Sequence, residues 1–146
     1  MDLIVLGVSH KTASAEIRDS VQVLPEEMEP FYRRLRGSGD VIREAVVLST
    51  CNRTEFYAFT RSRPEADQLL RETVDDLKGV SHLRDGRYTY SWVGRETVRH
   101  LFRVASGMDS LMVGEPQILG QVRTAFEAAD RHGAVGALLP RLFNSA

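Results

Sequence analysis

The chain has 146 residues, of which 42% are hydrophobic and 27% are charged, and its formal net charge is -1. These proportions are typical of a folded water-soluble domain and exclude disordered and fibrous chains. No apolar run approaches the roughly 20 residues of a membrane-spanning helix, and the first residues lack the basic segment of a secretory leader. We therefore expect a cytoplasmic protein, in which any nucleic acid is bound by a local patch rather than by overall charge.

The first part of the chain alternates between strand and helix patterns. Leu3 to Ser9 predicts a buried strand, Ser14 caps a short helix, and a second helix starts at Leu24 and stops near Gly37. Residues 44–50 and 54–60 form two β-prone runs joined by Cys51-Asn52-Arg53, a spacing that fits a hairpin. A helix over 64–77 and a strand over 87–93 follow. The order βαββαβ predicts a ferredoxin-like α+β fold, with an antiparallel sheet covered by helices.

After Gly94 the pattern changes to helices only, over 95–106, 116–131 and from Val135 onward. We therefore predict a ferredoxin-like subdomain at residues 1–93 and a small helical subdomain at 94–146. The last segment reaches Ala146 without a glycine, proline or cap. This pattern suggests a truncated piece of a longer enzyme.

Cys51 is the first candidate for chemistry. A single cysteine can be a small buried hydrophobic residue, but its neighbours Thr50, Asn52 and Arg53 are polar. A guanidinium two residues away would favour the reactive thiolate. Both interpretations remain open on these residues alone.

His100 is the second candidate. Val98, Leu101, Phe102 and Ala105 have the spacing of a buried helix face, which would place His100 roughly opposite that face. The alternatives are simple solvent exposure or a role in a site formed against the cysteine-bearing subdomain.

Two further segments carry polar groups at the ends of elements. Pro116 begins a helix on which Gln117 and Gln121 share the side away from the buried residues, which are Ile118, Val122, Ala125 and Ala129. These glutamines can bind a polar ligand or simply face solvent. The segment from Ser9 to Thr12 ends the first strand, and either a site or a plain turn fits it.

The sequence gives no signal for a metal or a nucleotide cofactor. The four histidines (His10, His82, His100 and His132) lack the spacing of metal ligands. The eleven glycines form neither a G-x-G-x-x-G motif nor a P-loop. We predict no metal site and no cofactor-binding residues in this chain.

Three ordered blocks resemble the glutamyl-tRNA reductase family in its N-terminal catalytic domain. They are GVSHKTA (Gly7 to Ala13), LSTCNRTE (Leu48 to Glu55) and HLFRVASGMDSLMVGEPQILGQV (His100 to Val122). Together they cover nearly the whole chain.

The resemblance implies an oxidoreductase of tetrapyrrole (haem) biosynthesis. Such enzymes form a thioester between the cysteine and the glutamyl group of glutamyl-tRNA, and reduce it with NADPH to glutamate-1-semialdehyde. It makes Cys51 the nucleophile and His100 a residue important for activity. It assigns the glutamyl group to these residues: Thr50, Asn52, Arg53, Ser110, Glu115, Pro116, Gln117 and Gln121.

The resemblance also implies that NADPH binds to a following domain, and that the full-length enzyme is a homodimer and a possible partner of an aminomutase. This chain would then form the thioester or hydrolyse glutamyl-tRNA without reducing it. Two alternatives stay open. One is a non-catalytic ferredoxin-like module that binds an amino acid or RNA, and the other is an unrelated cysteine hydrolase, which requires a histidine beside the sulfur.

Overall fold

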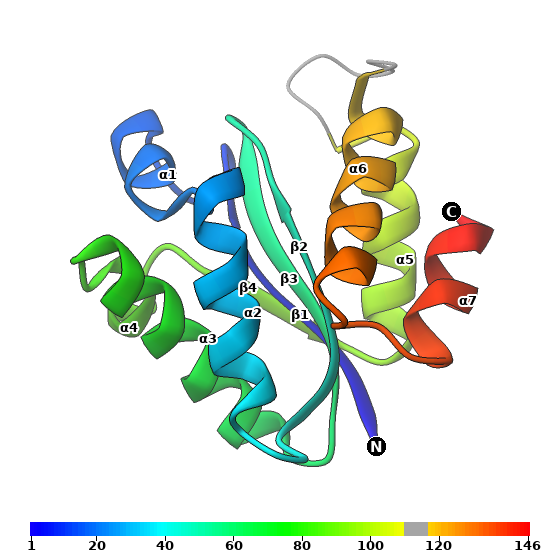
Figure 1. Ribbon diagram of the computed structural model, residues 1–146. Helices are drawn as coiled ribbons and strands as arrows, with labels where there is room; N and C mark the ends of the chain where they lie inside the picture. The colour runs from blue at the N-terminus through cyan, green and yellow to red at the C-terminus, as the bar shows by residue number, and fades with distance from the viewer. Residues whose placement is uncertain (110–116) are drawn as a thin grey trace.

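The chain folds around a four-stranded antiparallel sheet in a computed structural model that describes residues 1–109 and 117–146 (Figure 1). The strands are β1 (Asp2–Ser9), β2 (Ile42–Ser49), β3 (Arg53–Thr60) and β4 (Tyr90–Val93). Their order in the sheet is β2-β3-β1-β4, so the first strand lies in the interior of the sheet. The predicted mixture of helices with an antiparallel sheet is confirmed.

Helices cover both faces of this sheet. Figure 1 shows α2 and α3 on one side and α5, α6 and α7 on the other. Because both faces are covered, β1 is buried from Leu3 to Ser9 instead of alternating between apolar and polar residues. The bounds of the helices are α1 (Ala15–Val21), the 3-10 turn η1 (Pro25–Glu27), α2 (Met28–Arg36), α3 (Arg63–Lys78), α4 (His82–Asp85), α5 (Arg95–Ala105), α6 (Gln117–Arg131) and α7 (Leu138–Ser145). Within the described ranges, none of these helices has the length and apolar character needed to cross a bilayer.

Alternate residues of β3 face opposite sides of the sheet, as the pleat requires. The ring of Phe56 lies 5.6 Å from that of Phe31 in α2, whereas the ring of Tyr57 lies 5.6 Å from that of Phe143 in α7. Arg53 and Glu55 are on the same side as Tyr57. The strand therefore places a guanidinium and a carboxylate under the C-terminal helices, where their residues are 1% and 0% exposed.

Residues on both sides of Gly94 contribute to one continuous core, which includes Leu6 and Val47 of the sheet and Leu101 and Val122 of the helices. Gly94 has a φ of 63°, a value that favours glycine, and its N–H donates to the carbonyl of Leu3 at 2.7 Å. The chain thus turns from β4 directly into α5. This turn brings the helices after Gly94 back onto the sheet.

The edge strand β2 is joined to the C-terminal helix by a buried carboxylate. Glu44 is 6% exposed and accepts hydrogen bonds from the N–H groups of Gly136, Leu138 and Leu139 at 2.7, 3.1 and 2.9 Å. These donors lie at the start of α7, where backbone N–H groups lack partners within the helix. Glu44 therefore caps α7 from a distant part of the sequence.

Two elements of the structure differ from the prediction. The strand expected over 87–93 is limited to Tyr90–Val93, because β1 pairs with it only from Ile4 to Gly7. The short helix α4 was not predicted. Its N-terminal N–H groups at Leu83 and Arg84 donate to the buried carboxylate of Asp75 in α3 at 3.1 and 2.9 Å, so its cap comes from tertiary structure.

The predicted buried face of α5 is also partly wrong. Leu101 and Ala105 are buried as expected, but Phe102 is 41% exposed. Thr97 and Val104 are buried instead, so the buried face of the helix is centred on Thr97, Leu101 and Val104. His100 lies beside this face and contacts Glu55 of β3.

Candidate active site

Cys51 lies in the turn between β2 and β3 and is exposed to solvent. The turn is held by Thr50, whose N–H donates to the carbonyl of Arg53 at 2.7 Å and whose hydroxyl accepts from the N–H groups of Asn52 and Arg53 at 3.1 and 3.3 Å. Such side-chain to backbone bonds are typical of turns built on threonine. The alternative of a buried, packed cysteine is therefore wrong, and the thiol is accessible on a well-defined turn.

Residues from the segment after β1 support the same turn from outside. The N–H of His10 donates to the carbonyl of Asn52 at 3.0 Å, and Nε of Arg18 donates to the carbonyl of Cys51 at 3.1 Å. Arg18 also donates to the carbonyl of Ala13 at 2.8 Å. Burial, followed by the positive charge of Arg53, lowers the pKa of His10. The first block of the sequence and the cysteine turn thus form one structural unit.

Arg53 is buried and faces two carboxylates. Its Nη1 donates to Glu55 at 3.2 Å and to Asp109 at 3.1 Å, and its Nη2 donates to the carbonyl of Asp109 at 2.5 Å. Burial opposes the charge of Arg53, but Glu55 and then Asp109 outweigh it and raise the pKa of Arg53. Much of the guanidinium that was expected to bind substrate is therefore occupied by the protein itself.

Glu55 is the centre of a buried polar network that the sequence analysis did not identify. One carboxylate oxygen accepts from the hydroxyl of Tyr57 at 2.7 Å. The other is in contact with the hydroxyl of Tyr90, with Nη1 of Arg53, and with Nε2 of His100 at 2.5 Å. A buried carboxylate needs hydrogen-bond donors to replace the water that it has lost, and these side chains supply them.

The directions of the pKa shifts in this network are consistent with an ionised Glu55. Burial raises the pKa of Glu55, but His100, Arg53 and Tyr90 outweigh that effect and lower it. Burial and the nearby Glu55 charge raise the pKa values of Tyr57 and Tyr90 well above their ordinary value, so both are neutral donors. Because an ionised carboxylate only accepts, the proton between Glu55 and His100 belongs to Nε2 of His100.

Gly7 is required for this arrangement. A Cβ atom at Gly7 would lie 2.8 Å from the hydroxyl oxygen of Tyr90 and 2.9 Å from Cγ of Glu55. Both distances are shorter than van der Waals contact. The glycine of the first block therefore allows Tyr90 and Glu55 to meet across β1.

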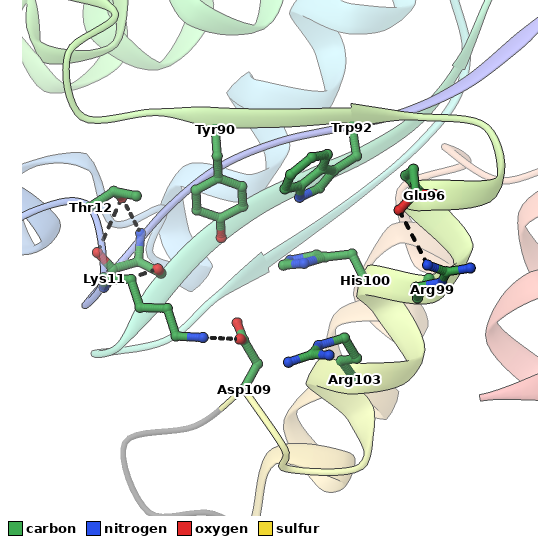
Figure 2. Close-up of a pocket in the computed structure, with 10 residues that line it drawn as sticks. Lys11, Thr12, Tyr90, Trp92, Glu96, Arg99, His100, Arg103 and Asp109 are labelled. Atoms are coloured by element: carbon green, nitrogen blue, oxygen red, sulfur yellow. Dashed lines mark hydrogen bonds and ion pairs between the residues drawn. The ribbon is translucent and has the colours of Figure 1, made fainter.

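His100 also lines a pocket of about 390 Å³ between β4, α5 and the end of β1 (Figure 2). Figure 2 shows Tyr90 and Trp92 on one wall, His100 and Arg103 on another, and Lys11 in contact with Asp109 near the mouth. The side chain of His100 is 13% exposed, so the alternative of a solvent-exposed histidine is wrong. Ser9, Lys11 and Thr12 line the pocket as well, and the segment after β1 thus contributes to a cavity.

The predicted glutamines lie elsewhere. Gln117 and Gln121 are exposed and line a different, largely apolar groove of about 520 Å³ between α6, the end of β2 and η1. The predicted buried face of α6 is confirmed at Ile118, Val122, Ala125 and Ala129. Ser110, Glu115 and Pro116 lie outside the described residues. Ser49, two residues before Cys51, also lines this groove.

Some of these relationships had a signal in the sequence. Arg53, Glu55 and Tyr57 alternate in a β-prone run, and this period predicts that they share one face of a strand. Asp109 and Tyr90 had no such signal, because they reach the site from segments that are distant in sequence. Within the described ranges, no cluster of His, Cys, Asp or Glu residues is arranged to hold a metal ion.

Comparison with known proteins gives a consistent result. The family model described as "Glutamyl-tRNAGlu reductase, N-terminal domain" matches residues 6–146. A glutamyl-tRNA reductase of Stenotrophomonas maltophilia is 46% identical over 143 residues, covering 98% of this chain and 31% of the relative. One from Geobacter sulfurreducens is 43% identical over 146 residues, covering 100% of this chain and 33% of the relative.

A solved structure is also similar. The glutamyl-tRNA reductase from Methanopyrus kandleri superimposes with a TM-score of 0.73 at 35% identity, covering 97% of this chain and 31% of that one. These matches define the class of this fold as the N-terminal domain of glutamyl-tRNA reductases. The chain belongs to the glutamyl-tRNA reductase family. It spans about a third of the length of the relatives that it matches.

Proposed function

We propose that this chain carries the thiol chemistry of glutamyl-tRNA reductase, with Cys51 as the nucleophile. The observation that supports this most directly is an exposed cysteine on a turn that five backbone and side-chain hydrogen bonds hold in place. A thiolate attacks an activated acyl ester without strong acid catalysis. Sulfur forms a bond to the glutamyl carbonyl carbon, the bond from that carbon to the ribose oxygen breaks, and the ribose oxygen takes up a proton.

His100 is a suitable source of that proton. Its Nε2–H is committed to Glu55, so Nδ1 of the neutral imidazole is an acceptor; it would take up the proton released by the thiol and then donate it to the ribose oxygen. Direct stabilisation of the thiolate is less well supported, because the described contacts pair His100 with Glu55 and not with the sulfur of Cys51. Glu55 would fix the tautomer and orientation of the imidazole, as a carboxylate does for a catalytic histidine.

We retain Thr50, Asn52, Arg53, Ser110, Glu115, Pro116, Gln117 and Gln121 as the proposed residues for the glutamyl group. Their roles differ, however. Thr50 shapes the turn. Arg53 would bind a substrate carboxylate only if that carboxylate replaced Asp109, or through guanidinium N–H groups that are not bonded to the protein. Gln117 and Gln121 have no ion or side chain as hydrogen-bond partner among the described residues, which suits a role in binding polar groups of a ligand.

The residues of this chain do not fit a complete NADPH site, because no glycine-rich dinucleotide motif is present. We propose that NADPH, which the family uses, is bound by a part of the relatives beyond the shared third. We also propose that the full-length enzyme forms a homodimer and that an aminomutase is its partner. We also propose the ferredoxin-like classification with subdomains 1–93 and 94–146, supported by the strand order β2-β3-β1-β4 and by the all-helical segment after Gly94.

Mass spectrometry of the chain after exposure to glutamyl-tRNA tests the function. We expect a glutamyl adduct on Cys51, no adduct in Cys51→Ser, and no semialdehyde when NADPH is added to the chain. Ester cleavage that persists in Cys51→Ser would contradict the nucleophile assignment. A chain that binds glutamyl-tRNA but forms no adduct would instead favour the non-catalytic binding module.

An unrelated cysteine hydrolase is less consistent with the site. Such an enzyme needs a histidine hydrogen-bonded to the nucleophile and oriented by a third residue. In the part of the chain that the structure describes, His100 has an orienting carboxylate but contacts Glu55 and not the sulfur of Cys51.

A further inference from the structure

Lys11 is a charged side chain of the site to which the proposed thiol chemistry gives no role. It follows β1 and lines the pocket beside His100, and Figure 2 shows its ammonium reaching Asp109 near the mouth of that pocket. The side chain of Lys11 is 57% exposed. The chain has one other lysine, Lys78, whose side chain is 15% exposed and pairs with Glu27. Lys11 is thus the lysine that a ligand can reach.

The backbone of Lys11 is fixed beside the cysteine turn. Its N–H donates to the hydroxyl of Ser9 at 3.2 Å, and the N–H of His10 donates to the carbonyl of Asn52 at 3.0 Å. Ser9 also pairs with Arg53 in the register of β1 and β3. A flexible side chain that ends in an ammonium therefore extends from a fixed point close to the turn that carries the proposed nucleophile.

The carboxylate of Asp109 connects Lys11 to the buried Arg53. One of its oxygens accepts from the ammonium of Lys11, and the other accepts from Nη1 of Arg53 at 3.1 Å. Burial raises the pKa of Asp109, but the bonds from Lys11 and Arg53 outweigh that effect and lower it, so Asp109 is ionised near neutral pH. The two cations are very different in their access to solvent, since the side chain of Arg53 is 1% exposed.

Lys11 can leave Asp109 more easily than Arg53 can. An ion pair with one solvent-exposed partner is weak, whereas a pair whose partners are both buried is costly to break. Asp109 also keeps Arg53 as a partner when Lys11 moves away, because Arg53 donates both to its carboxylate and to its carbonyl. The ammonium of Lys11 is therefore the charge of this group that is free to exchange one carboxylate for another.

We propose that Lys11 binds the side-chain carboxylate of the glutamyl group in exchange for Asp109, and that this contact selects a glutamyl group over aminoacyl groups with neutral side chains. The proposal rests on the proposed function and adds a specificity-determining residue to it. Asp109 occupies the ammonium when no substrate is bound, so it is a competitor of the substrate carboxylate. An amide in place of the substrate carboxylate gains no charge-assisted bond from Lys11 and does not displace Asp109.

Calorimetric titration of the Cys51→Ser chain tests the proposal without thiol chemistry. The ligands are the α-methyl esters of glutamate and glutamine, which have nearly the same size and differ in the charge of the side chain. We expect the glutamate ester to bind roughly tenfold more tightly, the effect of one charge-assisted hydrogen bond. Lys11→Met is expected to weaken binding of the glutamate ester by about the same factor and to leave the glutamine ester unchanged. Lys11→Arg should keep the preference, because it keeps the charge.

Two further variants separate recognition from a structural role. Lys78→Met is the matched control, because it removes the other lysine, which pairs with Glu27 at 2.8 Å, and it should leave binding of both esters unchanged. Asp109→Asn removes the competing charge and is expected to tighten binding of the glutamate ester by roughly threefold. If the pair of Lys11 and Asp109 only held the site together, loss of either partner would weaken binding.

Four results would overturn the proposal. They are equal binding of the two esters, no binding of either ester, unchanged binding of the glutamate ester by Lys11→Met, and weaker binding of that ester by Asp109→Asn. Formation of the glutamyl adduct is measured separately, in the chain that retains Cys51 and with glutamyl-tRNA. Failure of the nucleophile assignment and failure of the role of Lys11 can therefore be distinguished.

Discussion

Replacing Arg53 with lysine separates two possible roles of this residue. As a substrate-binding cation, Arg53 should matter for glutamyl transfer and little for stability. As the structure has it, Arg53 is 1% exposed and donates to three acceptors, which are Glu55 and both the side chain and the carbonyl of Asp109. Lysine keeps the positive charge, but its ammonium is a compact group that does not reproduce the planar fork of arginine.

The expected cost follows from these contacts. Hydrogen bonds to charged groups contribute about 1.5–3 kcal/mol each, and lysine is expected to retain one or two of the three. Breaking a buried pair completely costs about 3–5 kcal/mol. We therefore expect Arg53→Lys to lower the free energy of unfolding by roughly 2–4 kcal/mol, which leaves a domain of ordinary stability still folded at room temperature.

Urea unfolding followed by circular dichroism measures this change. We expect a lower midpoint with an unchanged slope. Arg61→Lys is the matched control, because Arg61 and its partner Glu65 are both 54% exposed and such surface pairs contribute little. An Arg53→Lys chain that unfolds at the parent midpoint but no longer forms the Cys51 adduct would refute the structural role and support the substrate-binding one.

Three other predictions follow from the same contacts. Gly7→Ala is expected to destabilise the chain by about 1–3 kcal/mol because its Cβ would overlap Tyr90 and Glu55, and urea unfolding should show no such loss for Gly120→Ala, where nothing lies within 4 Å. Glu44→Ala is expected to cost roughly 2 kcal/mol and to speed amide hydrogen exchange at the start of α7, since three N–H groups lose their acceptor; unchanged exchange there would contradict the capping role. The lowered pKa values of Glu55 and Asp109 contribute stability that is present above about pH 4 and is lost as the pH falls through the folded-state values. The urea midpoint of a Glu55→Gln chain should therefore fall less between pH 7 and pH 3 than the midpoint of the parent chain does. Equal pH profiles of the two chains would contradict this.

The sequence by itself determined most of the local structure. Short-range patterns were sufficient for the strands around Val5 and Val47 and for the buried face of α6, because periodicity and caps act over a few residues. They also placed Cys51 in a turn with polar neighbours. The family followed from three blocks of residues whose order and spacing are specific.

Only the tertiary structure decided how these parts meet. Glu55 and His100 are far apart in the chain, as are Arg53 and Asp109, and their contacts depend on the order of the strands and on how α5 packs against the sheet. The same packing leaves Phe102 exposed and buries much of His100. Arg53 appeared from the sequence to be a free cation beside the thiol, but the pleat of β3 directs it into the interior, where two carboxylates neutralise it. Burial makes this pairing necessary, and burial is a property of the whole fold rather than of any short segment.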